Sequence, residues 1–218
     1  MCFSPIASFA TAGLTGAIGI ASLARVTQPR ELPLAATPLI FGVQQAVEGA
    51  LWINLPLAPS GAAVAGLTLV FLLFAQVFWP VYAPLVVWSL EPNERRRRLM
   101  LMCLALGVGL ASYLLWRLLG GPREAVIVNG CIVYRTQPGH LVPVALAYLA
   151  ATCLPPVISS RRTILALGAV ILAGSVVAYI FYWEAFLSVW CFFAAAASAV
   201  ILGHLELARR QRLQPAGA

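Results

Sequence analysis

Apolar runs joined by short polar connections extend along nearly the whole chain. A helix needs roughly 20 mostly apolar residues to cross the hydrocarbon core of a bilayer, which is about 30 Å thick. Seven segments meet this requirement: 5–25, 32–55, 62–90, 99–119, 140–159, 163–182 and 185–207. The pattern predicts an all-α membrane protein in which residues 1–218 form a single transmembrane domain, a seven-transmembrane-helix bundle. Ser4-Pro5, a capping residue followed by a proline suited to the first helical position, predicts where the first helix begins.

The pattern is irregular in two places. Pro80 and Pro84 lie within the long third segment and are expected to kink it or to end its regular part early. Thr163 to Leu207 contains neither a proline nor a polar loop, and a single helix of this length would be about 68 Å long, more than twice the bilayer core. We therefore expect a turn, at Tyr182-Trp183-Glu184.

Residues 123–136, between the fourth and fifth segments, have a different pattern. Two runs rich in β-branched residues flank Asn129-Gly130, which is the strongest short-range signal for a β-hairpin. A two-residue turn places these residues opposite one another: Val128 and Cys131, Ile127 and Ile132, Val126 and Val133, Glu124 and Arg135. The opposite charges of the last pair support this register. Because both faces of the hairpin are apolar, we expect it to lie over the outer end of the bundle.

Composition supports the membrane class. Hydrophobic residues make up 61% of the chain and charged residues 10%, whereas about a quarter of an ordinary soluble domain is charged. A transmembrane β-barrel is excluded, because its strands would alternate apolar and polar residues over segments of about ten residues.

The net charge of +7 comes from fourteen basic residues, all of them arginine. They cluster in short loops between apolar runs, which is typical of membrane orientation and not of a nucleic-acid-binding groove. If the N-terminus lies outside, the cytoplasmic side receives Arg25, Arg30, Arg95, Arg96, Arg97, Arg98, Arg161, Arg162, Arg209, Arg210 and Arg212, and the outer side receives Arg117, Arg123 and Arg135. This bias predicts an N-out, C-in protein with an extracytoplasmic hairpin. Contact with anionic lipid headgroups is the expected role of Arg95–Arg98.

Polar residues gather in the outer half of the predicted bundle. Gln44, Glu48 and Trp52 are spaced by four and share one helix face, next to Gln45. Similar faces are predicted on the first, fifth and seventh segments, formed by Ser4, Ser8 and Thr11, by His140 and Tyr148, and by Glu184, Ser188 and Cys191. The candidate ligand-binding residues are therefore Gln44, Gln45, Glu48, Trp52, His140, Tyr148, Glu184, Ser188 and Cys191.

Glu48 is the most informative member of this set. A charged side chain at the middle of a span costs roughly 2.5–3.5 kcal/mol on insertion scales, so the residue should face the interior, paired or protonated. Two interpretations remain open: a functional carboxyl group, or a neutral one that hydrogen-bonds the neighbouring glutamines and stabilises helix packing.

Several chemistries are excluded by missing residues. The chain has no lysine for a retinal or pyridoxal Schiff base and no aspartate for a Ser-His-Asp triad, and its two histidines are too few for a three-histidine zinc site. A mixed metal site formed by Glu48, His140, Glu184 and Cys191 stays permitted, and no particular cofactor is indicated. Cys2 and Cys131 are both predicted on the outer side, where thiols oxidise, and we expect a disulfide between them.

Three stretches resemble a family of small bacterial polytopic membrane proteins that begin Met-Cys-Phe-Ser and have no assigned activity. These stretches are Met1-Cys2-Phe3-Ser4 with Ala7-Ser8-Phe9, Gln44-Gln45-x-x-Glu48-Gly49, and Ser188-Val-Trp-Cys-Phe-Phe-Ala194. The resemblance covers nearly the whole chain and implies a multi-pass protein of the bacterial inner membrane.

The function expected from these residues is the binding of a small ligand, ion or proton in an outward-facing polar pocket, by a sensor or transporter. One alternative is an intramembrane enzyme, metal-assisted or not, that acts on a lipid with Glu48 as general base or ligand. Another is an accessory subunit of a larger membrane complex, and a homo-oligomer is also compatible with the chain.

The predicted orientation is tested by reporter fusions. Alkaline phosphatase fused at Ala218 should be inactive, because the enzyme needs the extracytoplasmic compartment, and the same reporter inserted in the 123–136 hairpin should be active. An active fusion at Ala218 would contradict the N-out, C-in topology.

Overall fold

The computed structural model describes residues 4–136, 141–181 and 186–213. In these residues the chain forms seven helices and one two-stranded antiparallel sheet, when the continuous helical stretch 62–90 is counted once. The elements are α1 (Pro5–Leu23), η1 (Pro29–Glu31, a short 3₁₀ turn), α2 (Leu32–Asn54), α3 (Ala62–Leu72), η2 (Leu73–Phe78, a π-helical segment), α4 (Trp79–Leu90), α5 (Glu94–Gly120), β1 (Arg123–Val128), β2 (Cys131–Thr136), α6 (Leu141–Val157), α7 (Arg162–Phe181) and α8 (Phe186–Leu213).

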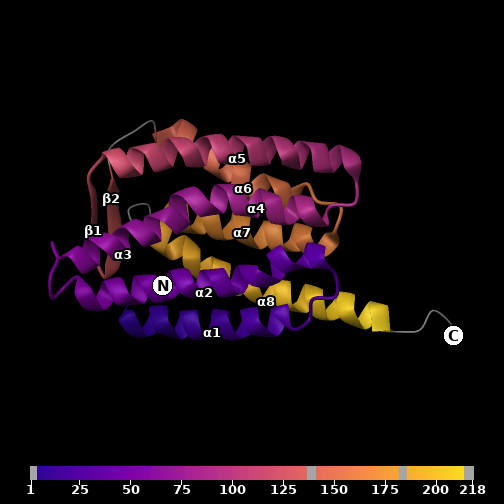
Figure 1. Cartoon of the computed structure of the whole chain (residues 1–218), viewed down its shortest axis with the longest axis horizontal. Helices are drawn as coiled ribbons and strands as arrows, with labels where there is room; N and C mark the ends of the chain where they lie inside the picture. The colour runs from indigo at the N-terminus through magenta and orange to yellow at the C-terminus, as the bar shows by residue number, and fades with distance from the viewer. Residues whose placement is uncertain (1–3, 137–140, 182–185, 214–218) are drawn as a thin grey trace.

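The long helices run side by side along the long axis of the molecule (Figure 1). α1 and α2 form the closest pair, and α8 packs against both of them and against α7. On the other side α4, α5 and α6 pack on one another, and α7 joins this group through α6. The hairpin lies at one end of the bundle, opposite to the end at which α8 terminates.

The predicted segments match the helices closely, with two differences at the arginine-rich end. α5 begins at Glu94 instead of residue 99, because the side chain of Asn93 accepts a hydrogen bond from the backbone N–H of Arg96 and caps the helix there. α8 continues to Leu213 instead of residue 207. The stretch predicted as a loop around Arg95–Arg98 is therefore helical. The predicted turn at residues 182–184 lies outside the described residues.

Three helices in the described part of the chain are long and apolar enough to cross a membrane: Pro5–Leu23, Ala62–Leu90 and Glu94–Gly120. Val142–Val157 and Arg162–Ala178 are apolar but shorter. The seven predicted segments are confirmed as helices. Three of these helices are long and apolar enough to cross a membrane.

Small residues allow α1 and α2 to approach closely. The buried side of α1 carries Ser8, Thr11, Thr15, Gly19 and Ser22 at successive helical turns. A Cβ placed on Gly19 would lie 2.5 Å from the backbone nitrogen of Leu39, and one on Gly42 would lie 3.0 Å from the carbonyl oxygen of Ala12. Such close contact between helix backbones requires glycine. Small residues at the interface allow helices to associate in an apolar environment.

The π-helical segment η2 precedes Pro80 and exposes one backbone carbonyl. In an α-helix the N–H of Trp79 would bond the carbonyl of Ala75, but here it bonds that of Phe74. The next donor along the chain would be Pro80, which has no N–H. The hydroxyl of Tyr148 on α6 donates to the Ala75 oxygen instead, at 2.6 Å.

A tyrosine also donates to a backbone carbonyl of α2. Pro38 lies inside this helix, and the carbonyl oxygen of Pro33, five residues before it, accepts the Tyr82 hydroxyl from α4 at 2.7 Å. The hydroxyl of Thr37 also donates to this oxygen, at 3.0 Å. In both helices a tyrosine from a neighbouring helix donates to the carbonyl that lies five residues before a proline.

Pro84 exposes a third carbonyl, that of Pro80, because residue 84 has no N–H with which to bond it. This oxygen lies so close to α5 that a Cβ built on Gly107 would be 1.9 Å from it. Any side chain at position 107 would force α4 and α5 apart. The predicted disturbance of the third segment by Pro80 and Pro84 therefore takes the form of a π-helical interruption and a close helix contact.

The hairpin has the predicted register at every pair, from Val128 opposite Cys131 to Glu124 opposite Arg135. Asn129 and Gly130 both have positive φ, 51° and 72°, as a two-residue type I′ turn requires. The ion pair of Glu124 and Arg135 is 4.0 Å long and well exposed, so it adds little stability.

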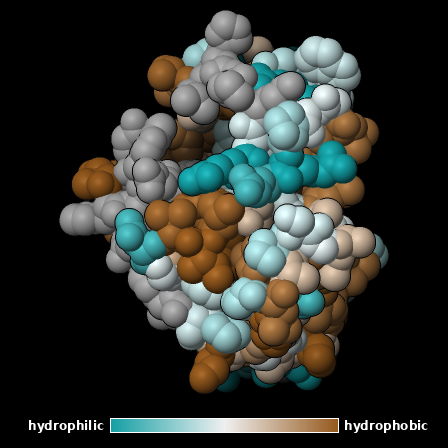
Figure 2. All heavy atoms as spheres, turned by 90° about the vertical axis from the view of Figure 1, so that its left-hand side faces the viewer, coloured by the Kyte–Doolittle hydropathy of each residue, from teal (hydrophilic) through white to brown (hydrophobic). Residues whose placement is uncertain are grey.

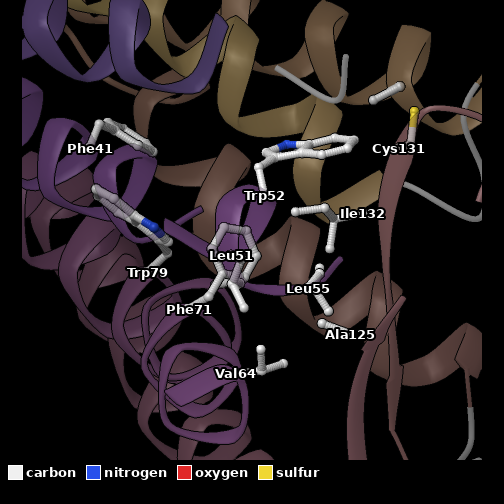
Figure 3. Packing of buried hydrophobic residues seen from close by; sticks show 12 residues of the cluster. Phe41, Leu51, Trp52, Leu55, Val64, Phe71, Trp79, Ala125, Cys131 and Ile132 are labelled. Carbon is white, nitrogen blue, oxygen red and sulfur yellow. The ribbon is translucent and has the colours of Figure 1, made fainter. Parts of the chain in front are cut away.

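Its buried residues anchor the hairpin on the bundle. Ala125 and Ile132 join Leu51, Trp52 and Leu55 in one apolar cluster, and Figure 3 shows Trp52 alongside Ile132 and Cys131. Cys131 is a buried thiol within this cluster. Cys2, its expected disulfide partner, lies outside the described residues.

Replacing Gly107 by alanine tests the contact of α4 with α5. A helical Gly→Ala change normally gains up to about 1 kcal/mol, but here the overlap with the Pro80 oxygen should cost about 1–3 kcal/mol and lower the thermal unfolding temperature. Gly109→Ala on the same helix is the control, because no atom lies within 4 Å of its Cβ position, and it should be neutral or stabilising. Equal unfolding temperatures for the two variants would contradict the close contact.

Candidate functional site

Three polar side chains on α2 are completely buried. Gln44, Gln45 and Glu48 each have 0% of their surface exposed, although the helix around them is apolar. The side-chain amide of Gln45 donates to the Glu48 carboxyl oxygen Oε2 at 3.3 Å. The amide oxygen of Gln44 accepts the indole N–H of Trp79 at 2.7 Å. Two successive turns of α2 thus form one polar group in the interior, the Gln44–Glu48 cluster.

Aromatic rings enclose one side of this cluster. Phe41, one turn before Gln45, stacks on Trp79 with ring centroids 4.0 Å apart (Figure 3). Phe78 and Tyr82 contact Trp79 edge to face. The Trp79–Gln44 hydrogen bond therefore lies in surroundings that exclude water, where hydrogen bonds are electrostatically stronger than in water.

Helices α1 and α8 lie along other sides of α2. Ser8 of α1 is completely buried, and a Cβ added to Gly49, next to Glu48, would lie 2.9 Å from the ring of Phe9. The absence of a side chain at position 49 brings α1 against α2 beside the carboxyl group. The side chains of α8 between residues 186 and 196 lie outside those the structure describes.

The predicted ligand-binding residues have different environments. Trp52 is 8% exposed, and its indole N–H is buried without a hydrogen-bond partner. Tyr148 donates its hydroxyl to the Ala75 carbonyl and packs against the apolar cluster. His140 and Glu184 lie outside the described residues, as do the side chains of Ser188 and Cys191. Within the described chain, the structure brings together Gln44, Gln45 and Glu48.

Trp79 is a member of the cluster that sequence reasoning missed. Its hydrogen bond joins residues 35 positions apart, from helices that the sequence does not show to be neighbours. No local pattern around residue 79 could have indicated this contact.

Two further glutamates, Glu31 and Glu91, are buried in the connections at the opposite end of the bundle from the hairpin. The Glu31 carboxylate accepts hydrogen bonds from the backbone N–H groups of Thr27 and Gln28 and from the Thr27 hydroxyl. A proline near a helix start followed by glutamate is a capping signal that could have indicated this role. Glu31 thus orders the connection between α1 and α2.

Glu91 joins two connections that are distant in the sequence. Its carboxylate accepts bonds from the hydroxyls of Ser159 and Ser160 and from the backbone N–H groups of Ser160 and Asn93. The Arg161 guanidinium donates to the Leu90 carbonyl beside it at 2.9 Å. Burial raises the pKa of Glu91, but the hydrogen bonds from Ser160, Asn93 and Ser159 outweigh burial and lower it overall.

The arginines of this end also make contacts within the protein. Arg96 donates to the Ile158 carbonyl at 2.9 Å, and the Arg97 guanidinium lies 4.5 Å from the centre of the Trp88 ring. Arg25 and Arg210 both bond the Glu206 carboxylate. These contacts place the arginines of four separate segments at one end of the bundle.

A cavity of about 70 Å³ lies between α2, α4, α6, α7 and α8. Phe41 and Trp79 line it, so these two residues lie between the cavity and the Gln44–Glu48 cluster. The predicted ligand-binding residues whose side chains the structure describes, Gln44, Gln45, Glu48, Trp52 and Tyr148, do not line this cavity. Among the residues described, no group of three or more His, Cys, Asp or Glu side chains could hold a metal ion.

The described chain is a helical bundle with a buried carboxyl group, and three of its helices are long and apolar enough to cross a membrane. Comparison with protein families gives the particular group: residues 1–217 match the model of a family of unknown function, DUF6629. The chain belongs to this family. No curated protein and no solved structure matches it.

Glu91→Gln tests the connection between the two loops. The folded state holds the pKa of Glu91 below its ordinary value of 4.5, so the ionised group stabilises the fold above that pH, and this contribution is lost as the pH falls through the lowered folded-state pKa. At neutral pH the variant should lose about 1–3 kcal/mol of unfolding free energy, and its difference from the unmodified protein should shrink on acidification below pH 4.5.

Glu94→Gln is the control for this measurement. Glu94 is an exposed carboxylate three residues away, on the first turn of α5, and its replacement should change stability by less than about 0.5 kcal/mol. A Glu91→Gln protein as stable as the Glu94→Gln protein at neutral pH would contradict the role of Glu91.

Proposed function

We propose that the chain is a multi-pass integral membrane protein of the bacterial inner membrane, oriented N-out and C-in. Three helices with membrane-crossing length and composition support this setting. Large apolar side chains are exposed on the outside of the bundle, among them Ile6, Leu14, Ile20, Met102 and Val142. In water such a surface would be unfavourable, whereas lipid chains would cover it.

The distribution of charge along the bundle supports the orientation. Contacts between Arg25 and Glu206, and between Arg96 and Ile158, place the arginine-rich segments at one end, which in this proposal faces the cytoplasm and anionic lipid headgroups. Figure 2 looks onto the opposite end, where the hairpin lies, and shows a hydrophilic band bordered by hydrophobic patches. An end face of this kind suits a boundary between water and lipid.

Within this setting, the protein binds a proton, an ion or a small ligand at the Gln44–Glu48 cluster, as a sensor or transporter. The observation that carries this proposal is the complete burial of Glu48 together with the two completely buried glutamines one turn before it. A carboxyl group in an apolar interior is stable when it is neutral or paired, so the loss of its proton requires a compensating cation or ligand nearby. Binding and release at this position therefore change the local charge, which is what a sensor or transporter uses.

Comparison with Glu31 and Glu91 supports a functional role. Those two carboxylates each accept backbone N–H groups of a connection, so their burial is explained by the structure that they order. Glu48 lies within a continuous helix whose backbone N–H groups serve the helix itself. Gln45 of the same helix donates its side-chain amide to the Glu48 carboxyl group at 3.3 Å.

Dicyclohexylcarbodiimide tests the proposal, because this apolar reagent reacts with protonated carboxyl groups and forms a stable acylurea. We expect mass spectrometry of the labelled full chain to place the modification on Glu48, and Glu48→Gln to remove it while the protein still folds. Protection of Glu48 by added Na⁺ would identify an ion as the ligand.

Glu124→Gln is the matched control, since Glu124 is an exposed carboxylate of the hairpin, and this variant should be labelled as the unmodified protein is. The absence of label on Glu48 in the unmodified protein, or undiminished label in Glu48→Gln, would contradict the proposal.

A further inference from the structure

The cavity between α2, α4, α6, α7 and α8 is a second site, separate from the Gln44–Glu48 cluster. Its volume of about 70 Å³ is several times the roughly 10–15 Å³ that a single water molecule needs. Most of its wall is aliphatic or aromatic, with Leu34, Val86, Val87, Leu167, Ile171 and Ile201 among the lining residues.

Four of the described lining residues have polar side chains, and each of these side chains already donates a hydrogen bond within the protein. Thr37 and Tyr82 both donate to the Pro33 carbonyl, at 3.0 and 2.7 Å. The Trp79 indole donates to Gln44 at 2.7 Å.

The fourth polar residue is Thr152 of α6, which is buried. Its hydroxyl donates to the Tyr148 carbonyl one turn earlier, at 2.8 Å. Among the lining residues that the structure describes, the cavity therefore offers an occupant no uncommitted side-chain hydrogen-bond donor. A polar occupant would lose its hydrogen bonds to water without replacement, which is costly in an apolar interior.

We propose that this cavity binds the hydrocarbon chain of a membrane lipid. A hydrocarbon chain needs no hydrogen bonds and gains free energy for each methylene group that contacts the apolar wall. The bilayer supplies such chains at the exposed apolar faces of the helices, for example at Leu101, Met102 and Val108 of α5. This inference rests on the proposed membrane setting and does not depend on what Glu48 binds.

A lipid chain in the cavity would affect the Gln44–Glu48 cluster through its contact with Trp79. The ring of Trp79 lines the cavity, and its N–H is bonded to Gln44. A lipid chain against this ring holds it in place and so maintains the hydrogen bond to the buried amide.

Photolabelling of the full chain in phosphatidylcholine vesicles tests this inference. The probe is a phosphatidylcholine with a diazirine at the end of one acyl chain, and peptide mass spectrometry locates the label after irradiation. We expect label on cavity residues such as Ile171 and Ile201 as well as on the exposed face of α5, which serves as an internal reference for contact with lipid.

Ala197→Phe should fill the cavity, because Ala197 is a buried lining residue. The cavity label relative to the α5 label should then fall about tenfold, the change that 1.4 kcal/mol of binding free energy produces. Val108→Phe, on the exposed face of α5, is the matched control and should leave the cavity label unchanged.

The labelling pattern of the unmodified protein tests the lipid site even if Ala197→Phe does not fold. Label on the α5 face without label on the cavity residues would overturn the lipid site while leaving the membrane setting intact. Label on neither surface would overturn both. Equal cavity label in the unmodified protein and a folded Ala197→Phe variant would also contradict the site.

Discussion

The arrangement of the central helices depends on backbone carbonyls that prolines leave without their usual donors. In an apolar interior an unsatisfied carbonyl costs as much as a lost hydrogen bond, so each needs a partner or a close neighbour. Tyr148 satisfies the Ala75 oxygen, and Gly107 lets α5 approach the Pro80 oxygen. Tyr82 adds a hydrogen bond to the Pro33 oxygen of α2. These contacts join α2 to α4, η2 to α6 and α4 to α5. Prolines that would destabilise an isolated helix thus determine which helices are neighbours.

The same requirement governs the buried side chains. Glu31 and Glu91 are buried where backbone N–H groups and hydroxyls of the connections converge on their carboxylates. Glu48 is buried within a helix, next to Gln45 and one turn after Gln44. A polar group buried in this way requires hydrogen-bond partners that a leucine would not require, which is why we propose it as the binding position.

Trp79 connects the two features of the interior. Its indole N–H belongs to the polar cluster, and its ring belongs to the wall of the apolar cavity. It also stands at the start of α4, directly after the π-helical segment. A π-helical turn shifts the residues that follow it around the helix axis, and in this protein the residue that follows immediately is Trp79. The position of the Trp79 ring therefore depends on the π-helical segment that precedes it.

The sequence by itself determined the helices and the hairpin, because both depend on local rules. Apolar periodicity and length located seven helices to within about two residues, except at the start of α5 and the end of α8. Asn129-Gly130 specified the turn and the register of every cross-strand pair. The sequence also identified Gln44, Gln45 and Glu48 as unusual, since a polar group in an apolar run stands out without any knowledge of neighbours.

Only the tertiary structure decided which groups meet. The partners of Gln44, Glu91 and the Ala75 carbonyl come from residues 35, 69 and 73 positions away, and no local pattern encodes such distances. The hairpin places the Cys131 thiol in the apolar cluster with Ile132 and with Trp52, a residue of α2 that the hairpin sequence does not indicate as its neighbour. The cavity is likewise formed where five helices meet, and the described polar side chains in its wall, from α2, α4 and α6, already donate hydrogen bonds elsewhere. Helix formation is a local property of a chain, whereas the choice of hydrogen-bond partners between helices depends on how all of them pack together.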